Sequence, residues 1–368
     1  MILVNDPGND SAYAPLKHAV WSGWTPTDLI FPFFLFIVGV SLVLSFRSRV
    51  ERGESKRTLM IHALRRSVII FLIGLFLNGF PYFNLSTWRV AGVLQRIAIA
   101  YLAAAIITLY SGTRGIVIWI GGLLVGTGSQ CDSSPCRDSA YPVVICRCSI
   151  RTQISTGIST SSTCQEPCMR RPRDPEGILS TFPAIASALL GVLTGIWLKA
   201  PRKPASATLN GALSQPRDSS GKVIGMLASG FVLIVAGQIW NIWFPINKKL
   251  WTSSFVLFTA GCALVVLAVC YWIIDFRQHR GWWTKPFVVF GTNAIVAYTL
   301  AEMVSSLLYN LRVHSGRRVI SLQDFLYRMF FGSFSPKELG SLIYAVVFVC
   351  LCWLPICWMY RKRIFLKV

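Results

Sequence analysis

Two ionisable residues near the start of the chain, His18 and Asp28, are the strongest candidates for chemistry. A neutral imidazole can serve at pH 7 as a general base, or as a nucleophile that carries an acyl group. Asp28 can orient such an imidazole or accept its proton. Both residues also have structural explanations. His18 could simply lie at a membrane surface and hydrogen-bond to water or backbone, without a chemical role. Asp28 could close a capping box with Thr25 as N-cap and Pro26 at the first helical position.

A second group of polar residues lies inside apolar stretches. Arg96 and Glu302 are charged residues at membrane depth, where a charge is costly and marks a cavity, a partner or a snorkelling side chain. The expected counter-charge of Arg96 is an anionic ligand group or Glu302. Tyr298 lies four residues before Glu302 and shares its helix face, whereas Asn293 lies almost two turns earlier. Hydrogen bonding between helices is the alternative explanation for Asn293 and Tyr298.

Long apolar runs have to position these residues. Hydrophobic residues make up 54% of the 368-residue chain and charged residues only 14%, against about 25% charged in an average soluble domain. Nine charge-poor runs are present, at 29–46, 67–83, 97–113, 115–127, 178–198, 223–246, 250–274, 286–311 and 339–360. Most approach the length of about 20 residues that a membrane-spanning helix needs, but 115–127 is too short to cross untilted. Because no alternating pattern supports a barrel, the sequence predicts an all-α, polytopic transmembrane bundle of about nine spans.

The basic residues are unevenly distributed between the two ends of such a bundle. Without the long loop 128–177, the loops opposite the His18 side hold 20 Lys and Arg, and those on the His18 side hold 9. The positive-inside rule therefore places the basic side in the cytoplasm and His18 outside. Topology and attraction to anionic lipid explain the net charge of +21, and this argues against a nucleic-acid partner.

Residues 128–173 differ in composition from the rest of the chain. They are rich in Ser, Thr, Arg and Pro, contain six of the eleven Cys, and lack helical or strand periodicity. One explanation is an external loop stapled by disulfides. A stretch translated in the wrong reading frame is favoured, because the preceding apolar run stops abruptly and membrane-protein composition resumes sharply at 174–177. Paired CxxC or HxxxH spacing is absent, so no metal site is expected.

The segment 199–222 is predicted to divide the chain. It is rich in Pro, Ser and Lys, a composition typical of a disordered linker. It would separate the first spans, 1–198, which carry the His18 loop, from the C-terminal spans, 223–368.

Four segments in this order are similar to a known family. They are YAPLKHAVWSGWTPTDLIFPFF (13–34), WRVAGVLQRIA (88–98), DPEGILST (174–181) and GTNAI (291–295). With them the chain resembles the transmembrane acetyltransferases related to heparan-α-glucosaminide N-acetyltransferase, and most closely their shorter bacterial members. The resemblance covers nearly all of the chain outside 128–173.

This resemblance implies that an acetyl group passes from cytosolic acetyl-CoA to the amine of a glucosamine-type sugar on the outer side of a bacterial inner membrane. By motif, His18 corresponds to the family's catalytic His, Asn5 to an Asn of the same loop, and Asp28 to the Asp that opens the next helix. The residues expected to bind substrate or acetyl-CoA are Gln95, Arg96, Asn293, Tyr298 and Glu302.

Two other functions stay open on the sequence. In a transporter or permease, Arg96 and Glu302 would be sites for substrate or protons. An inactive, truncated family member is the other alternative, because relatives usually have a full first helix before the His18 loop. Met1 is therefore expected to be an internal start. The sequence does not fix the natural acceptor, the choice between direct transfer and an acetylated His18, or the presence of a homo-oligomer.

Overall fold

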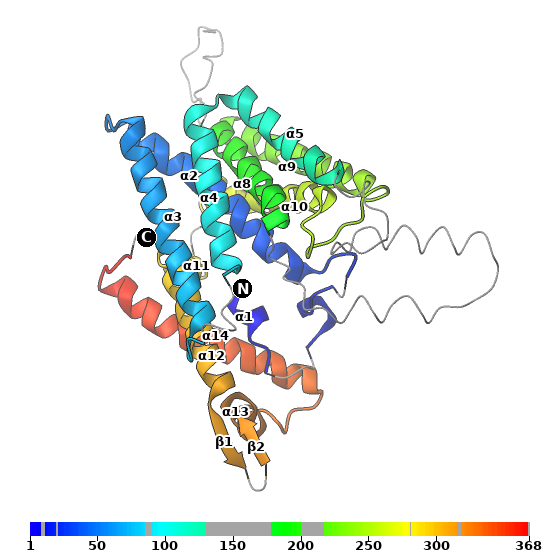
Figure 1. Ribbon diagram of the computed structural model, residues 1–368, viewed down its shortest axis with the longest axis vertical. Coiled ribbons are helices and arrows are strands. Elements are labelled where there is room, and N and C mark those ends of the chain that lie inside the picture. Colours follow the sequence, from blue (N-terminus) through cyan, green and yellow to red (C-terminus); the bar gives the residue numbers. More distant parts are fainter. Residues whose placement is uncertain are drawn as a thin grey trace, which may run out of the picture.

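The structure is a computed structural model that describes residues 1–8, 12–19, 21–84, 90–129, 178–199, 217–279, 281–315 and 318–366. Nearly all of the described elements are helices (Figure 1). In chain order they are α1 (Ile2–Asn5), η1 (Ala14–Leu16), η2 (Pro26–Leu29), α2 (Ile30–Val50), α3 (Lys56–Gly79), α4 (Val93–Tyr110), α5 (Thr113–Ser129), α8 (Ile178–Lys199), α9 (Arg217–Trp240), α10 (Ser253–Tyr271), η3 (Trp272–Phe276), α11 (Thr284–Thr292), α12 (Ala294–Asn310), α13 (Leu322–Phe330) and α14 (Lys337–Arg361). The hairpin β1 (Arg312–Ser315) and β2 (Arg318–Ser321) pairs antiparallel, with Val313 opposite Ile320.

The predicted all-α membrane bundle is confirmed. Seven helices in the described part of the chain are long and apolar enough to cross a membrane, and the bent pair α11–α12 is an eighth candidate. The run predicted at 115–127 forms α5, whose apolar part is shorter than the other spans. The chain is therefore an integral, multi-pass membrane protein.

Two helix boundaries differ by several residues from the ends of the charge-poor runs. Helix α3 begins at Lys56, well before the charge-poor run starts at 67, because Ser55 caps it by accepting the N–H of Thr58 at 3.2 Å. Helix α9 ends at Trp240 instead of 246. The Asn241 side chain accepts the Ile246 N–H at 2.7 Å and closes a loop there. Both differences come from side chains that bind backbone groups at helix ends, which hydropathy does not register.

The span predicted at 286–311 is broken. Helices α11 and α12 meet at 86°, and buried Asn293 lies at the break. Its Nδ2 donates to the Ile364 carbonyl oxygen at 3.1 Å, and its Oδ1 accepts the Leu366 N–H at 3.1 Å. The Asn293 amide therefore ties the break to the segment after α14. This use explains why Asn293 does not lie with the other polar residues of α12.

Close packing of α2 against α8 forms the centre of the bundle (Figure 1). A Cβ added at Gly39 would lie 1.9 Å from the Ala188 oxygen, and one at Gly191 would lie 2.0 Å from the Phe36 oxygen. Small residues allow two backbones to approach this closely. In lipid, helices associate largely through such packing, because burial of apolar surface gives little driving force there. Helix α10 also contacts α2, α5 and α8, so spans from before and after the predicted linker pack together.

Candidate functional site

The loop that carries His18 is fastened to the start of the next span. Thr27 donates from Oγ1 to the Pro15 carbonyl oxygen at 3.0 Å, which holds η1 against η2. The predicted capping box is present, with Thr25 and Asp28 bonding each other's backbone and side chain. Pro26 follows the cap, and its missing N–H costs nothing in a first turn. These local interactions hold the His18 loop close to Asp28.

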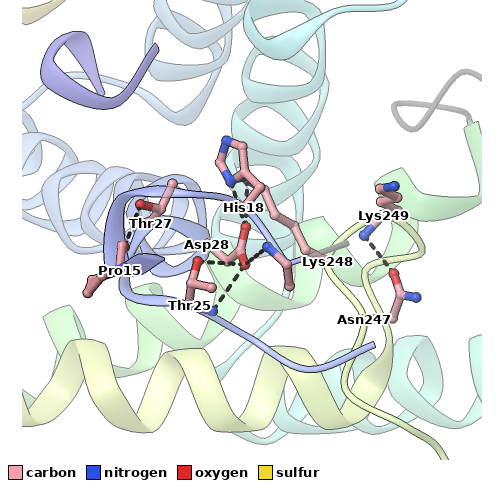
Figure 2. Close-up of polar contacts among 9 residues, drawn as sticks. Pro15, His18, Thr25, Thr27, Asp28, Asn247, Lys248 and Lys249 are labelled. Atoms are coloured by element: carbon pink, nitrogen blue, oxygen red, sulfur yellow. Dashed lines mark hydrogen bonds and ion pairs between the residues drawn. The ribbon is translucent and has the colours of Figure 1, made fainter. Parts of the chain in front are cut away.

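His18 and Asp28 are in direct contact (Figure 2). The imidazole Nδ1 lies 2.7 Å from Asp28 Oδ1. The Asp28 side chain is 1% exposed and that of His18 is 50% exposed, so a buried carboxylate holds an imidazole that solvent and substrate can reach. Figure 2 shows the second ring nitrogen directed away from the carboxylate. The two explanations of Asp28, helix cap and partner of His18, are therefore both realised in one side chain.

The hydrogen bonds of Asp28 determine which nitrogen of His18 is free. Its Oδ2 accepts the N–H groups of Ala19 and Thr25, each at 3.1 Å, and the Thr25 hydroxyl at 3.0 Å. A carboxylate with this many donors is ionised and only accepts. The 2.7 Å contact therefore assigns the proton to Nδ1 of His18, which leaves the lone pair of Nε2 available. This tautomer is suited to a general base or an acyl carrier.

Lys248 is a member of this site that the sequence analysis missed. It lies in the loop between α9 and α10, and its Nζ is 3.2 Å from Asp28 Oδ1 and 3.0 Å from His18 Nδ1. Lys248 and His18 are 230 residues apart, so no local sequence pattern could have predicted their contact. The neighbouring Asn247 and Trp251 are both almost fully buried, so this loop is anchored.

A second polar site lies among α3, α4 and α12. A cavity of about 160 Å³, here called the α3–α4–α12 cavity, is bordered on its polar side by Asn78, Gln95, Tyr298, Glu302 and Ser306. The expectation that Tyr298 and Glu302 share a face is confirmed, because both line this cavity. The C-terminal end of α3, the first turn of α4 and the later turns of α12 meet there.

Gln95 is the most unusual residue of the cavity. It is 3% exposed, and among the described residues neither Nε2 nor Oε1 of its amide has a hydrogen-bond partner. Its Oε1 is packed against two glycines, since a Cβ at Gly74 or Gly92 would lie 2.8 or 2.6 Å from it. A buried amide without partners costs free energy unless a bound group satisfies it. The α3–α4–α12 cavity is therefore a candidate ligand site.

Asn5 contacts the acid that lines this cavity. Its Nδ2 donates to Glu302 Oε1 at 3.2 Å. Of the two residues Asn5 and Asp28, Asp28 contacts the imidazole and Asn5 contacts the acid of α12. That either of them orients His18 stays a prediction. Asp6, the next residue, is buried and accepts a hydrogen bond from Ser305.

We expect an Asp6→Asn variant to be more stable than the parent at pH 7–8 and to lose this advantage toward pH 5. Burial raises the pKa of Asp6 from 3.8 to about 6; the Ser305 hydrogen bond opposes this rise and the Glu302 charge adds to it. The folded state therefore binds the proton more tightly than the unfolded state, and stability falls as pH rises from about 4 through 6. The advantage of the variant at pH 8 is on the order of 1–3 kcal/mol.

Thermal unfolding in detergent at several pH values measures this difference. Glu51→Gln, at an exposed surface pair with Arg47, is the matched control and should not show the same pH trend. A difference between Asp6→Asn and the parent that stays constant from pH 5 to 8 would contradict the assignment.

Arg96 faces a different neighbour from Gln95, because successive helical residues are turned by about 100°. Its Nη2 donates to Ser180 Oγ on α8. Its guanidinium carbon lies 5.2 Å from the centroid of the Trp251 ring. Arg96 is 3% exposed, so these contacts connect the first turn of α4 to α8 and to the Lys248 loop. They do not place it beside Glu302.

Two expectations concern residues that the structure does not describe. The segment 128–173, with its alternatives of disulfide-stapled loop and misread frame, lies outside the described residues except for the end of α5. Most of the predicted linker 199–222 does so too. Within the described ranges, no three His, Cys, Asp or Glu side chains converge on a site that could hold a metal ion.

Comparison with known proteins gives one family. Residues 11–212 match the family model described as "Heparan-alpha-glucosaminide N-acetyltransferase, catalytic", which is more than half of the chain. The chain belongs to this family. The matched residues include His18, Asp28, Gln95 and Arg96, whereas Lys248 and the α12 side of the cavity lie beyond them.

Two curated members of the heparan-alpha-glucosaminide N-acetyltransferase family are similar over most of this chain. The Homo sapiens heparan-alpha-glucosaminide N-acetyltransferase is 26% identical over 327 residues, which cover 75% of this chain and 47% of the human protein. The Mus musculus protein of the same name is 27% identical over 353 residues, 83% of this chain and 52% of its own length. The chain thus spans about half the length of the curated relatives it matches.

Proposed function

We propose that this protein transfers an acetyl group from cytosolic acetyl-CoA to the primary amine of a glucosamine-type sugar on the outer side of the membrane. The observation that carries the proposal is the exposed His18 imidazole bonded through Nδ1 to buried Asp28. Both residues lie within the match to a catalytic family model.

The reaction requires a base and a shielded meeting point. The amine nitrogen attacks the thioester carbonyl carbon, the C–S bond breaks, and CoA leaves as its thiol. His18 Nε2 takes the proton that the amine loses and passes it to the departing sulfur. If His18 is acetylated first, the same lone pair forms the N–C bond and the amine then displaces the imidazole. Both routes need a neutral His18 with its proton on Nδ1.

The acceptor sugar is proposed to bind in the α3–α4–α12 cavity. Glu302 supplies a carboxylate that accepts from a sugar hydroxyl, and Gln95, Asn78 and Tyr298 supply amide and hydroxyl groups for the rest of the ring. The cavity volume of about 160 Å³ suits a group of the size of one sugar ring. Support comes from Gln95, whose buried amide lacks partners among the described residues.

The first turn of α4 links the two sites. Gln95 lines the cavity, whereas Arg96 stacks on Trp251, and Trp251 follows Lys248 by three residues in the loop that reaches His18. Arg96 is proposed to position this connection. Asn293 is proposed to hold the bend between α11 and α12 and not to contact substrate.

The proposal is tested with sealed vesicles that contain the protein. Labelled acetyl-CoA on the cytoplasmic side and glucosamine on the outer side should yield N-acetylglucosamine outside. Glu302→Gln should raise the KM for glucosamine by about tenfold or more, the loss of one charge-assisted hydrogen bond, and should change the KM for acetyl-CoA little. Uptake of glucosamine without acetylation would favour the alternative of a transporter, in which Arg96 and Glu302 serve the transported solute.

A further inference from the structure

Lys248 makes a contact that the proposed chemistry leaves unexplained. Its Nζ approaches both members of the His18–Asp28 pair, at 3.0 Å from Nδ1 and 3.2 Å from Oδ1. Its side chain is 27% exposed, so the ammonium group lies at the rim of the site between solvent and a buried carboxylate.

The loop around Lys248 is built to hold this position. Asn247 accepts the N–H groups of Lys249 and Leu250 at 2.8 and 3.2 Å, and its own N–H donates to Thr252 Oγ1 at 3.1 Å. Trp251 is 1% exposed and packs edge-on against Phe31 at the start of α2. The backbone of Lys248 is therefore fixed between two anchored residues, next to the helix that Asp28 opens.

The position of the proton on His18 limits how the Lys248 ammonium group can interact with the imidazole. Nδ1 of His18 carries the proton that it donates to Asp28, and an ammonium group carries donors only. Lys248 and His18 Nδ1 are therefore two donors that share one acceptor, Oδ1. A second proton on the imidazole would place two positive charges about 3 Å apart, while the negative charge of Asp28 is already matched by Lys248.

Two other lysines, Lys17 and Lys249, are the chain neighbours of His18 and Lys248. Lys249 lies with its Nζ 5.4 Å from the centroid of the Trp21 ring. Among the described residues, Asp28 from η2 and Lys248 from the α9–α10 loop are the charged side chains that contact the imidazole.

We propose that Lys248 balances the charge of Asp28 and so keeps His18 neutral, with the Nε2 lone pair free for the acceptor amine. Without Lys248, the uncompensated carboxylate would stabilise the imidazolium form, which can neither accept a proton nor attack a thioester. In this scheme Asp28 orients the His18 imidazole, and Lys248 keeps that imidazole neutral. Lys248 is a positioning residue in this scheme, and the inference rests on the proposed role of His18 as base or acyl carrier.

The test compares Lys248→Met with Lys248→Arg, which keeps the charge. The first readout is acetyl transfer to glucosamine from pH 5 to 9. In Lys248→Met, the pH of half-maximal activity on the acidic side should rise by about one unit, as expected for the loss of a like charge within ~4–6 Å. Activity near pH 6 should then fall about tenfold, whereas activity at pH 9 changes less. Lys248→Arg should retain the parental midpoint, and so should Lys249→Met as the matched control.

A second readout is independent of catalysis. Diethyl pyrocarbonate reacts with neutral imidazole, and peptide-resolved mass spectrometry gives the modification of His18 as a function of pH. The midpoint should shift upward in Lys248→Met as it does for activity. If Lys248→Met does not fold, Lys248→Gln provides the same comparison.

The outcomes separate the two proposals. Lower transfer at every pH with no shift in either midpoint would show that Lys248 only fastens the loop, and would overturn the inference. A shifted labelling midpoint in a protein that transfers no acetyl group would reject the proposed function and retain the role of Lys248. Shifts in both readouts support both.

Discussion

Replacement of His18 by Ala is expected to lower acetyl transfer by about 10²–10⁴-fold, the usual contribution of a positioned general base. The loss should appear in kcat at saturating acetyl-CoA and glucosamine, because the imidazole acts on the attacking amine and not on the binding of either substrate. The side chain is half-exposed and Asp28 keeps its other donors, so the variant should unfold at nearly the parental temperature.

His314→Ala is the matched control. His314 lies in β1 of the hairpin after α12, opposite Val319, and its replacement should leave transfer unchanged. Parental activity in His18→Ala would exclude both the base and the acyl-carrier roles. In the parent, incubation with labelled acetyl-CoA and no acceptor distinguishes them, since only the acyl-carrier route leaves label on His18.

Replacement of Asp28 by Ala is expected to have the largest effect on stability of any single change at the site. The carboxylate is 1% exposed and accepts from His18, Lys248, Ala19 and Thr25. Without it, buried N–H groups and a lysine lose their partner, which costs about 3–5 kcal/mol by analogy with broken buried ion pairs. Thermal unfolding in detergent measures this loss.

Two further variants separate the roles of Asp28. Thr25→Ala removes one hydroxyl of the capping box and should cost about 1 kcal/mol, typical of a lost N-cap. Asp28→Asn keeps the shape of the side chain but can present an N–H to Nδ1, which favours the wrong tautomer of His18. It should fold better than Asp28→Ala and still lose about 10²–10⁴-fold in transfer, the scale seen when a buried acid beside a catalytic His becomes an amide. An Asp28→Asn protein with parental activity would leave Asp28 only its capping role.

Local interactions explain why part of the site could be predicted. Thr25, Pro26 and Asp28 fall at fixed positions of a helix start, where the first N–H groups need acceptors. The same argument held for Tyr298 and Glu302, because residues four apart share a helix face. Helix capping and the shared face of residues four apart depend only on the geometry of the helix itself. They are therefore the same in any fold that contains that helix.

Relations between distant elements could not be predicted in this way. Lys248 reaches His18 across 230 residues, and Asn5 meets Glu302 across 297. Helices α2 and α10 carry apolar residues around their circumference, so their sequences do not show which side meets a neighbour. The approach of Gly39 to Ala188 and of Gly191 to Phe36 selects that side only once both helices are packed.

The sequence by itself determined that the chain is a helical membrane protein and that His18 precedes a capped span headed by Asp28. Hydropathy and capping are properties of neighbouring residues, so they can be read along the chain. The tertiary structure alone decided that Lys248 contacts the His18 site, that Asn5 contacts Glu302, and that a predicted span bends at Asn293. Each of these depends on which helices pack together, and packing in lipid is set by surface shape rather than by hydrophobicity.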